Sequence, residues 1–127
     1  MVVARSFYVL AFGALVACAS AGTGTTPSRN SNVITEAEIA ASHESNAYDV
    51  IRSVRPLYLK SRGKSSVNNS ANEYATVYLD GQQYGDLSTL RSIAAAQIRE
   101  IRYYSASDAM TRFGMQAGGG AIEIFTK

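Results

Sequence analysis

The first strongly apolar segment of the chain is too short to belong to a membrane-spanning fold. Phe7 to Val16 is almost uninterrupted in its apolar character, and Arg5 places a positive charge before it. A stable transmembrane helix needs about 20 apolar residues. A basic start, a short apolar core and small residues are instead typical of a secretory signal. We therefore expect this segment to be removed, which leaves one small domain's length of chain to fold.

The residues that follow narrow the type of signal. Leu15-Val16-Ala17-Cys18 resembles the lipobox of bacterial lipoproteins, in which an aliphatic residue and small residues precede a cysteine. The resemblance implies a signal peptide over residues 1–17, transfer of diacylglycerol to the Cys18 thiol and acylation of the new N-terminus. Cys18 is the sole cysteine, so an internal disulfide is impossible. The alternative is simple secretion, with cleavage at a nearby alanine-rich site.

Residues 18–32 are predicted to form a flexible tether. They are mainly Ser, Thr, Gly, Ala and Asn with one Pro, and they lack the apolar side chains that would offset the entropy of ordering. Ala19 resembles the pattern that sorts lipoproteins to the outer membrane, so we expect a lipid-anchored protein of the cell envelope. Without Arg5, 11 Lys and Arg face 10 Asp and Glu. This near-neutral balance argues against a nucleic-acid partner.

Residues 33–127 are predicted to form one α+β domain. Thr35 and Glu38 form a capping-box pattern for a short helix that ends near Ser42. Asn46 caps a second helix, which Pro56 ends. The apolar stripe of this second helix has helical spacing: Ala47, Val50, Ile51 and Val54.

Strands and short helices alternate in the rest of the domain, which favours a small mixed β-sheet with short helices. A hairpin is expected to turn at Asp80-Gly81, and Ser61 to Asn72 is expected to be a loop. The expected strands are Leu57–Leu59, Tyr74–Leu79, Gln82–Tyr84, Ile98–Ser105 and Ala121–Thr126. The expected helices are Leu87–Ala96 and one that Ser107 caps and that runs through Arg112, before Gly114.

Five segments in order resemble the plug domain of TonB-dependent outer-membrane receptors. They are Val33–Ile39, Tyr48–Pro56, the Val77-Tyr78-Leu79-Asp80-Gly81 hairpin, Ala96–Ile101, and the end from Phe113-Gly114 through Gly119-Gly120-Ala121-Ile122 to Thr126-Lys127. The resemblance covers nearly all of the predicted domain and implies a plug-like fold. Arg-Pro stands at 55–56, where Pro-Gly is usual in the family.

The chain departs from a receptor in ways that bear on function. It stops at Lys127, one residue after the last plug-like strand, so we expect no transmembrane barrel in this polypeptide. No clear TonB-box-like segment is visible in the tether. We therefore expect a stand-alone plug-like domain that binds a protein or a ligand at the envelope. The alternative is an accessory subunit of a separately encoded transport barrel.

No catalytic, metal or cofactor site is expected. His43 is the sole histidine, and an exposed loop residue is the favoured interpretation. Asp80, Asp86 and Asp108 lie at predicted turns and helix starts. With no cysteine in the folded domain, a His/Cys metal site cannot form. The sequence thus lacks a nucleophile–base set and predicts a protein that is not an enzyme.

A binding surface is predicted from exposed aromatic and basic residues. Tyr78, Tyr84 and Tyr104 are expected to face outward from strands, and exposed aromatic residues are typical of interfaces. Arg52 and Arg55 begin a basic cluster that continues with Lys60, Arg62 and Lys64. Its alternatives are a solvated face with charges that favour a helix C-terminus, or a contact with anionic lipid, lipopolysaccharide phosphates or an acidic partner.

Overall fold

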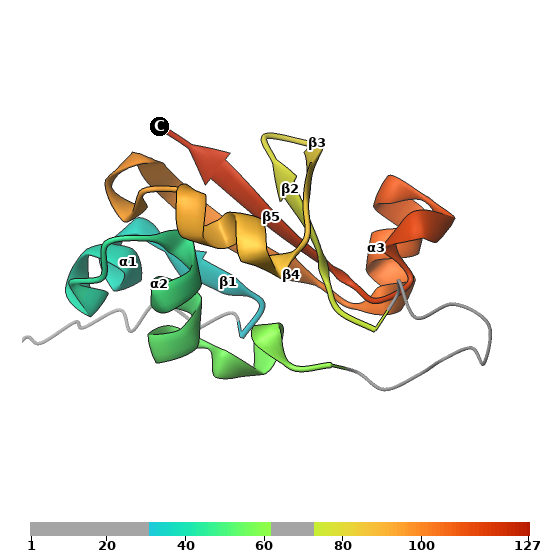
Figure 1. Cartoon of the computed structure of the whole chain (residues 1–127), viewed down its shortest axis with the longest axis horizontal. Helices are drawn as coiled ribbons and strands as arrows, with labels where there is room; N and C mark the ends of the chain where they lie inside the picture. The colour runs from blue at the N-terminus through green and yellow to red at the C-terminus, as the bar shows by residue number, and fades with distance from the viewer. Residues whose placement is uncertain (1–30, 62–72) are drawn as a thin grey trace, which may run out of the picture.

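A computed structural model describes residues 31–61 and 73–127 of the chain (Figure 1). Four predicted features lie outside these residues: the signal peptide, the lipidation site Cys18, the tether through Asn30 and nearly all of the loop from Ser61 to Asn72. The described part confirms the α+β class: a five-stranded mixed sheet is packed with short helices.

The sheet has the strand order β1-β4-β5-β2-β3. Its strands are β1 Val33–Thr35, β2 Thr76–Leu79, β3 Gln82–Gly85, β4 Ile98–Tyr104 and β5 Ala121–Thr126. β2 and β5 run parallel, and the other three neighbouring pairs are antiparallel. β5 therefore lies in the middle of the sheet, which explains why four of its residues in a row are buried.

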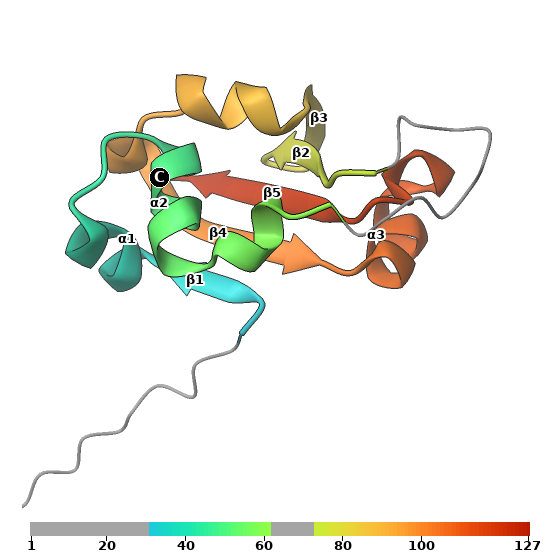
Figure 2. The ribbon, with the colours of Figure 1, turned by 60° about the horizontal axis from the view of Figure 1, so that its bottom comes forward.

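The main hydrophobic core lies on one face of the sheet, called the first face below (Figure 2). Helices α1 Glu36–Ser42 and α2 Ala47–Val54 pack there with three 3₁₀ segments, η1 Pro56–Leu59, η3 Leu87–Ser92 and η4 Ala95–Gln97. The sheet contributes large aliphatic side chains to this core: Ile34, Val77, Ile98, Ile101, Ile122 and Ile124. Ile101 and Tyr103 of β4 lie on this face, as do Ile122 and Ile124 of β5.

Both predicted helix caps in the N-terminal part are confirmed. The Thr35 hydroxyl accepts a hydrogen bond from the Glu38 amide, and the Glu38 carboxylate accepts one from the Thr35 amide. The Asn46 side chain accepts one from the Asp49 amide. These side chains pair amides that have no partner within the helix.

The hairpin at Asp80-Gly81 is also confirmed, with positive φ angles of 48° and 86° at its two turn residues. Such a turn matches the twist of its flanking strands and favours Asp-Gly. Asp80 does more than turn the chain. Its carboxylate accepts hydrogen bonds from the amide and the hydroxyl of Thr126, at 3.0 and 2.7 Å. The hairpin is thereby fastened to the end of β5.

Two predicted elements are wrong in type. Leu57–Leu59 is not a strand but belongs to η1. Pro56 is the first residue of η1, and the fixed φ of proline favours the start of a helical turn. The expected helix Leu87–Ala96 consists of two 3₁₀ segments, η3 and η4. Leu90 and Ile93 are buried in the first-face core, so the apolar spacing served tertiary packing rather than an α-helix.

One helix boundary and one additional strand also differ from the sequence prediction. Helix α3 spans Ala106–Phe113 and is capped by Ser105, not Ser107. Strand β1 is an additional strand, because Val33–Thr35 pairs with β4 immediately before the α1 cap. Helix α3 and the 3₁₀ turn η5 Met115–Ala117 lie at the end of the sheet where β4 finishes and β5 begins (Figure 1).

Candidate functional site

The second face of the sheet carries a group of polar and aromatic side chains. β5 alternates between the two faces, so Ala121, Glu123 and Phe125 lie opposite the core residues Ile122 and Ile124. On β4, Arg102 pairs with Glu123 and Tyr104 pairs with Ala121, and cross-strand partners share a face. This face is therefore built largely by the two central strands.

Glu123 is a buried carboxylate in the middle of this face. It is 1% exposed, and the Tyr104 hydroxyl donates a hydrogen bond of 2.8 Å to its Oε2. Nη2 of Arg112, from α3, lies 3.2 Å from each carboxylate oxygen. Buried charges require such partners, because desolvation without them is costly. Burial, followed by the hydrogen bond to Glu123, raises the pKa of Tyr104.

Tyr78 lies beneath this network, and the prediction that it faces outward is wrong. It is 3% exposed and stacks on Phe113 of α3, with ring centroids 3.8 Å apart. Phe113 also meets the Tyr104 ring edge to face, at 5.6 Å. Both faces of β2 are covered, because α3 packs on the second face and the main core on the first. Burial raises the pKa of Tyr78.

On the second face of the sheet, arginine guanidinium groups lie close to aromatic rings. The guanidinium of Arg112 lies 5.3 Å from the ring centroids of both Tyr104 and Phe113. Those of Arg102 and Arg99 lie 5.2 and 5.9 Å from the centroid of Phe125. We call these residues the arginine–aromatic patch: Arg99, Arg102, Tyr104, Arg112, Phe113 and Phe125.

The patch is ordered yet accessible. The Arg102 and Arg112 side chains are 47% and 49% exposed. Nε of Arg102 also bonds the Glu100 carboxylate, and this hydrogen bond raises the pKa of Arg102. Each exposed guanidinium is thus held over a ring and beside a carboxylate. Because these contacts already restrict each arginine side chain, the side chain loses less conformational entropy when it binds a partner.

The other predicted binding residues do not join the patch. Arg55 forms a 3.1 Å ion pair with Glu38 and so links α2 to α1 on the first-face side. Arg52 is exposed in the last turn of α2. Tyr84 is 46% exposed on β3, at the far edge of the sheet, with its hydroxyl 3.4 Å from Ser92 Oγ. Tyr104 is the only one of the five that belongs to the patch.

Six members of this site were not predicted as binding residues: Arg99, Arg102, Arg112, Phe113, Glu123 and Phe125. Glu123 had a visible signal, because it is a charged residue between two isoleucines in a strand that the pattern predicts to be buried. Such a residue requires a partner from another element. The sequence does not show that the partners are Tyr104 and Arg112, because they come from β4 and α3.

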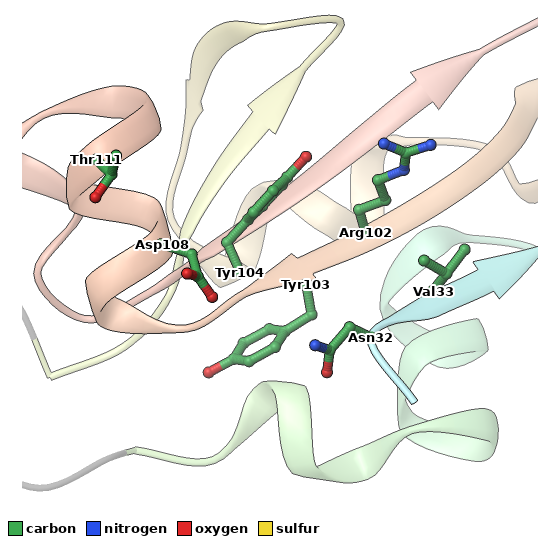
Figure 3. Close-up of a pocket in the computed structure, with 7 residues that line it drawn as sticks. All are labelled: Asn32, Val33, Arg102, Tyr103, Tyr104, Asp108 and Thr111. Atoms are coloured by element: carbon green, nitrogen blue, oxygen red, sulfur yellow. The ribbon is translucent and has the colours of Figure 1, made fainter. Parts of the chain in front are cut away.

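A notch adjoins the patch at the edge of β4, next to the chain that enters β1 (Figure 3). It lies between the start of β1 and helix α3 and has a volume of about 570 Å³. Seven residues line it: Asn32, Val33, Arg102, Tyr103, Tyr104, Asp108 and Thr111. Asp108 and Thr111 are three residues apart on α3 and therefore share one side of that helix.

The remaining candidate residues have local structural roles. His43 is exposed and ends α1 with a positive φ of 55°. Asp86 caps η3, and Asp108 lies in the first turn of α3. Within residues 31–61 and 73–127, no group of three or more His, Cys, Asp or Glu is placed to hold a metal ion. No helix of the described chain is long and apolar enough to cross a bilayer.

Comparisons of the chain with protein-family models, with curated proteins and with solved structures found no match. The described residues are therefore characterised by their own structure alone, as an α+β domain with an arginine–aromatic patch on one face of its sheet. The resemblance to receptor plug domains stays a prediction from the sequence.

Proposed function

We propose that this protein is a non-enzymatic lipoprotein of the bacterial outer membrane, whose plug-like domain binds another envelope protein through the second face of its sheet. The arginine–aromatic patch is the observation that carries the proposal. Two exposed guanidinium groups, on Arg102 and Arg112, are held over aromatic rings. Arginine and tyrosine are the residues most enriched, with tryptophan, among those that dominate binding energy at protein interfaces.

The chemistry of the patch indicates the kind of partner surface that it fits. The aromatic rings offer flat apolar area, and the guanidinium groups offer several N–H donors in a plane. Carboxylates and backbone carbonyl oxygens on a partner would accept from these donors. We infer a protein surface that presents such acceptors around an apolar centre, rather than a nucleic acid, because Glu100 and Glu123 offset the charges of Arg102 and Arg112.

The predicted anchor at Cys18 supports a partner in the same membrane. A tether of about 14 residues spans at most about 50 Å, at roughly 3.5 Å per residue. Lipidation would therefore confine the domain to a thin layer beside the membrane. This confinement raises its effective concentration for membrane proteins, so a modest intrinsic affinity suffices.

The experiment is quantitative capture of partners from native envelopes. The tagged, lipidated protein is purified from gently solubilised membranes, and the proteins that accompany it are identified by mass spectrometry. Arg102→Ala is expected to reduce the captured partner at least several-fold. The matched control is Arg91→Ala. Arg91 also lies over an aromatic ring, that of Tyr48 at 4.5 Å, but outside the patch. Equal capture by both variants would refute the proposed surface.

Membrane attachment is tested separately. Cys18→Ala is expected to move the protein from the membrane fraction to the soluble fraction, because it removes the atom that carries the lipid. Attachment that survives this substitution would contradict the lipoprotein assignment and leave the patch proposal standing.

The identity of the partner decides the alternative function. The five plug-like segments in family order favour an accessory subunit that docks on a separately encoded transport barrel. A stoichiometric outer-membrane barrel whose capture requires Arg102 would establish that function. A different partner captured with the same dependence would instead identify a general interaction module.

A further inference from the structure

We propose that the notch between β1, β4 and α3 is a binding site for a neutral carbohydrate. The inference goes beyond the proposed function, because it concerns a small ligand bound by the domain itself. It also stands without that function, since neither the anchor nor a protein partner is needed for the notch to form.

The shape of the notch is the first argument. β1 starts at Val33, opposite Arg102, so β4 continues past it towards α3 with no described strand on that side. The resulting opening of about 570 Å³ is within the range of small-molecule sites and has room for one or two sugar rings. It is bounded by β4, by the chain entering β1 and by one side of α3 (Figure 3).

The polar groups around the opening are the second argument. Figure 3 shows the Asp108 carboxylate, the Tyr103 ring and the Asn32 amide around the same space. The Thr111 hydroxyl donates to the Ser107 carbonyl at 3.0 Å, so its oxygen remains an acceptor. The Ser105 hydroxyl bonds Oδ2 of Asp108 at 2.6 Å and thereby orients the carboxylate. Carboxylate, amide and hydroxyl groups are complementary to sugar hydroxyls, which both donate and accept.

The aromatic ring in the lining is the third argument. Tyr103 stacks on Tyr58, with ring centroids 4.6 Å apart and planes inclined by 15°. This stacking covers one face of the Tyr103 ring and holds the ring in place beside the notch that it lines. A fixed aromatic ring beside hydrogen-bonding groups presents an apolar body with a polar rim, which matches the C–H faces and hydroxyl edges of a sugar.

Charge separates a neutral ligand from charged ones. Asp108 repels a phosphate or a carboxylate, whereas Arg102 at the rim repels an organic cation. A zwitterion would need both charges at once, but Arg102 is already bonded to Glu100. A polar molecule without net charge meets none of these costs.

The test is titration of the full chain in detergent, observed by the NMR shifts of its backbone amides. The probes are glucose, galactose, mannose and N-acetylglucosamine, two disaccharides (maltose and cellobiose), and choline and inorganic phosphate as charged comparators. At least one sugar is expected to shift the amides of Asn32, Tyr103, Asp108 and Thr111 in a saturable way. The expected dissociation constant is on the order of 1 mM, because the site is open and shallow.

Asp108→Asn is expected to weaken sugar binding about tenfold, since it removes a charged acceptor. Asp49→Asn is the matched control. Asp49 occupies the same third position of its helix and interacts with its own cap, Asn46, but it does not line the notch. It is expected to change binding less than twofold. The proposal fails if no sugar shifts the notch amides at about 50 mM, if choline or phosphate binds there more tightly, or if Asp108→Asn binds like the unmodified protein.

Discussion

The Tyr104 hydroxyl donates a 2.8 Å hydrogen bond to Glu123, a carboxylate buried at the centre of the sheet. Loss of this donor leaves the buried charge with Arg112, whose side chain is half exposed. We expect Tyr104→Phe to lower the free energy of unfolding by about 1–3 kcal/mol, the usual cost of an unsatisfied buried group. Chemical denaturation measures this change. Tyr84→Phe, at the exposed edge strand, is the control and should change stability by less than about 0.5 kcal/mol.

Gly120 is required by the close approach of β4. Its φ is 95°, and an added Cβ would lie 2.9 Å from the Tyr104 carbonyl oxygen and 3.2 Å from the Tyr103 hydroxyl. We expect Gly120→Ala to destabilise the fold by more than about 2 kcal/mol, from backbone strain and steric clash together.

Gly114→Ala separates these two causes. Gly114 has the same φ of 95°, but its nearest neighbour would lie 4.0 Å from the added Cβ. It should therefore incur the strain without the clash and cost about 1–2 kcal/mol. Thermal unfolding of both variants provides the measurement, and equal losses of stability would contradict the clash at Gly120.

Glu38 makes the stability of the domain depend on pH. Burial raises the pKa of Glu38, but hydrogen bonds from Thr35 and the nearby Arg55 outweigh that effect and lower it below its ordinary value of 4.5. A lowered carboxyl pKa stabilises the folded state above pH 4.5. That stabilisation is lost as the pH falls from 4.5 through the folded-state pKa.

Glu38→Gln tests this pH dependence, because glutamine can still serve in the capping box. At pH 7 the substitution is expected to cost up to about 1 kcal/mol, as for other surface ion pairs. The difference between the two proteins should shrink as the pH falls from 4.5 and vanish below the folded-state pKa of Glu38. Urea denaturation at a series of pH values measures it, and a difference that stays constant across this range would rule out the charge on Glu38 as its source.

Asp80 fastens the β2–β3 hairpin to β5. Hydrogen bonds from the Thr126 amide and hydroxyl lower the pKa of Asp80. Asparagine tolerates the positive φ of 48° at this position, whereas alanine does not. We expect Asp80→Asn to cost about 0.5–1.5 kcal/mol, through weaker hydrogen bonds. Asp80→Ala should cost more, because it loses both the turn preference and the acceptor. Hydrogen exchange at the Thr126 amide reports the fastening directly and should accelerate in both variants.

Local patterns explain which parts of the fold were predictable. The caps at Thr35 and Asn46 and the turn at Asp80-Gly81 depend on side chains that bond or shape backbone within a few residues, and all three are confirmed. Leu57–Leu59 and Leu87–Ala96 were wrong in type because both helical and extended backbones accept short apolar runs. Packing against the first-face core selected 3₁₀ turns in both places.

The candidate site was much less predictable than the fold. Tyr104 was expected to face outward, and it is a half-buried member of the patch. Tyr78 was expected to do the same, yet α3 covers it. Both residues are tyrosines on strands, and only the position of α3 distinguishes them. No local pattern in the sequence predicts which end of the sheet α3 covers.

The sequence by itself determined the α+β class, the capped helices, the hairpin and the apolar face of β5, because each depends on interactions between neighbours along the chain. Only the tertiary structure decided the second face. There, Glu123 of β5 meets Tyr104 of β4 and Arg112 of α3, and the end of β4 meets α3 at the notch. The physical reason is that a buried charge and a binding surface depend on which distant segments the sheet order brings together.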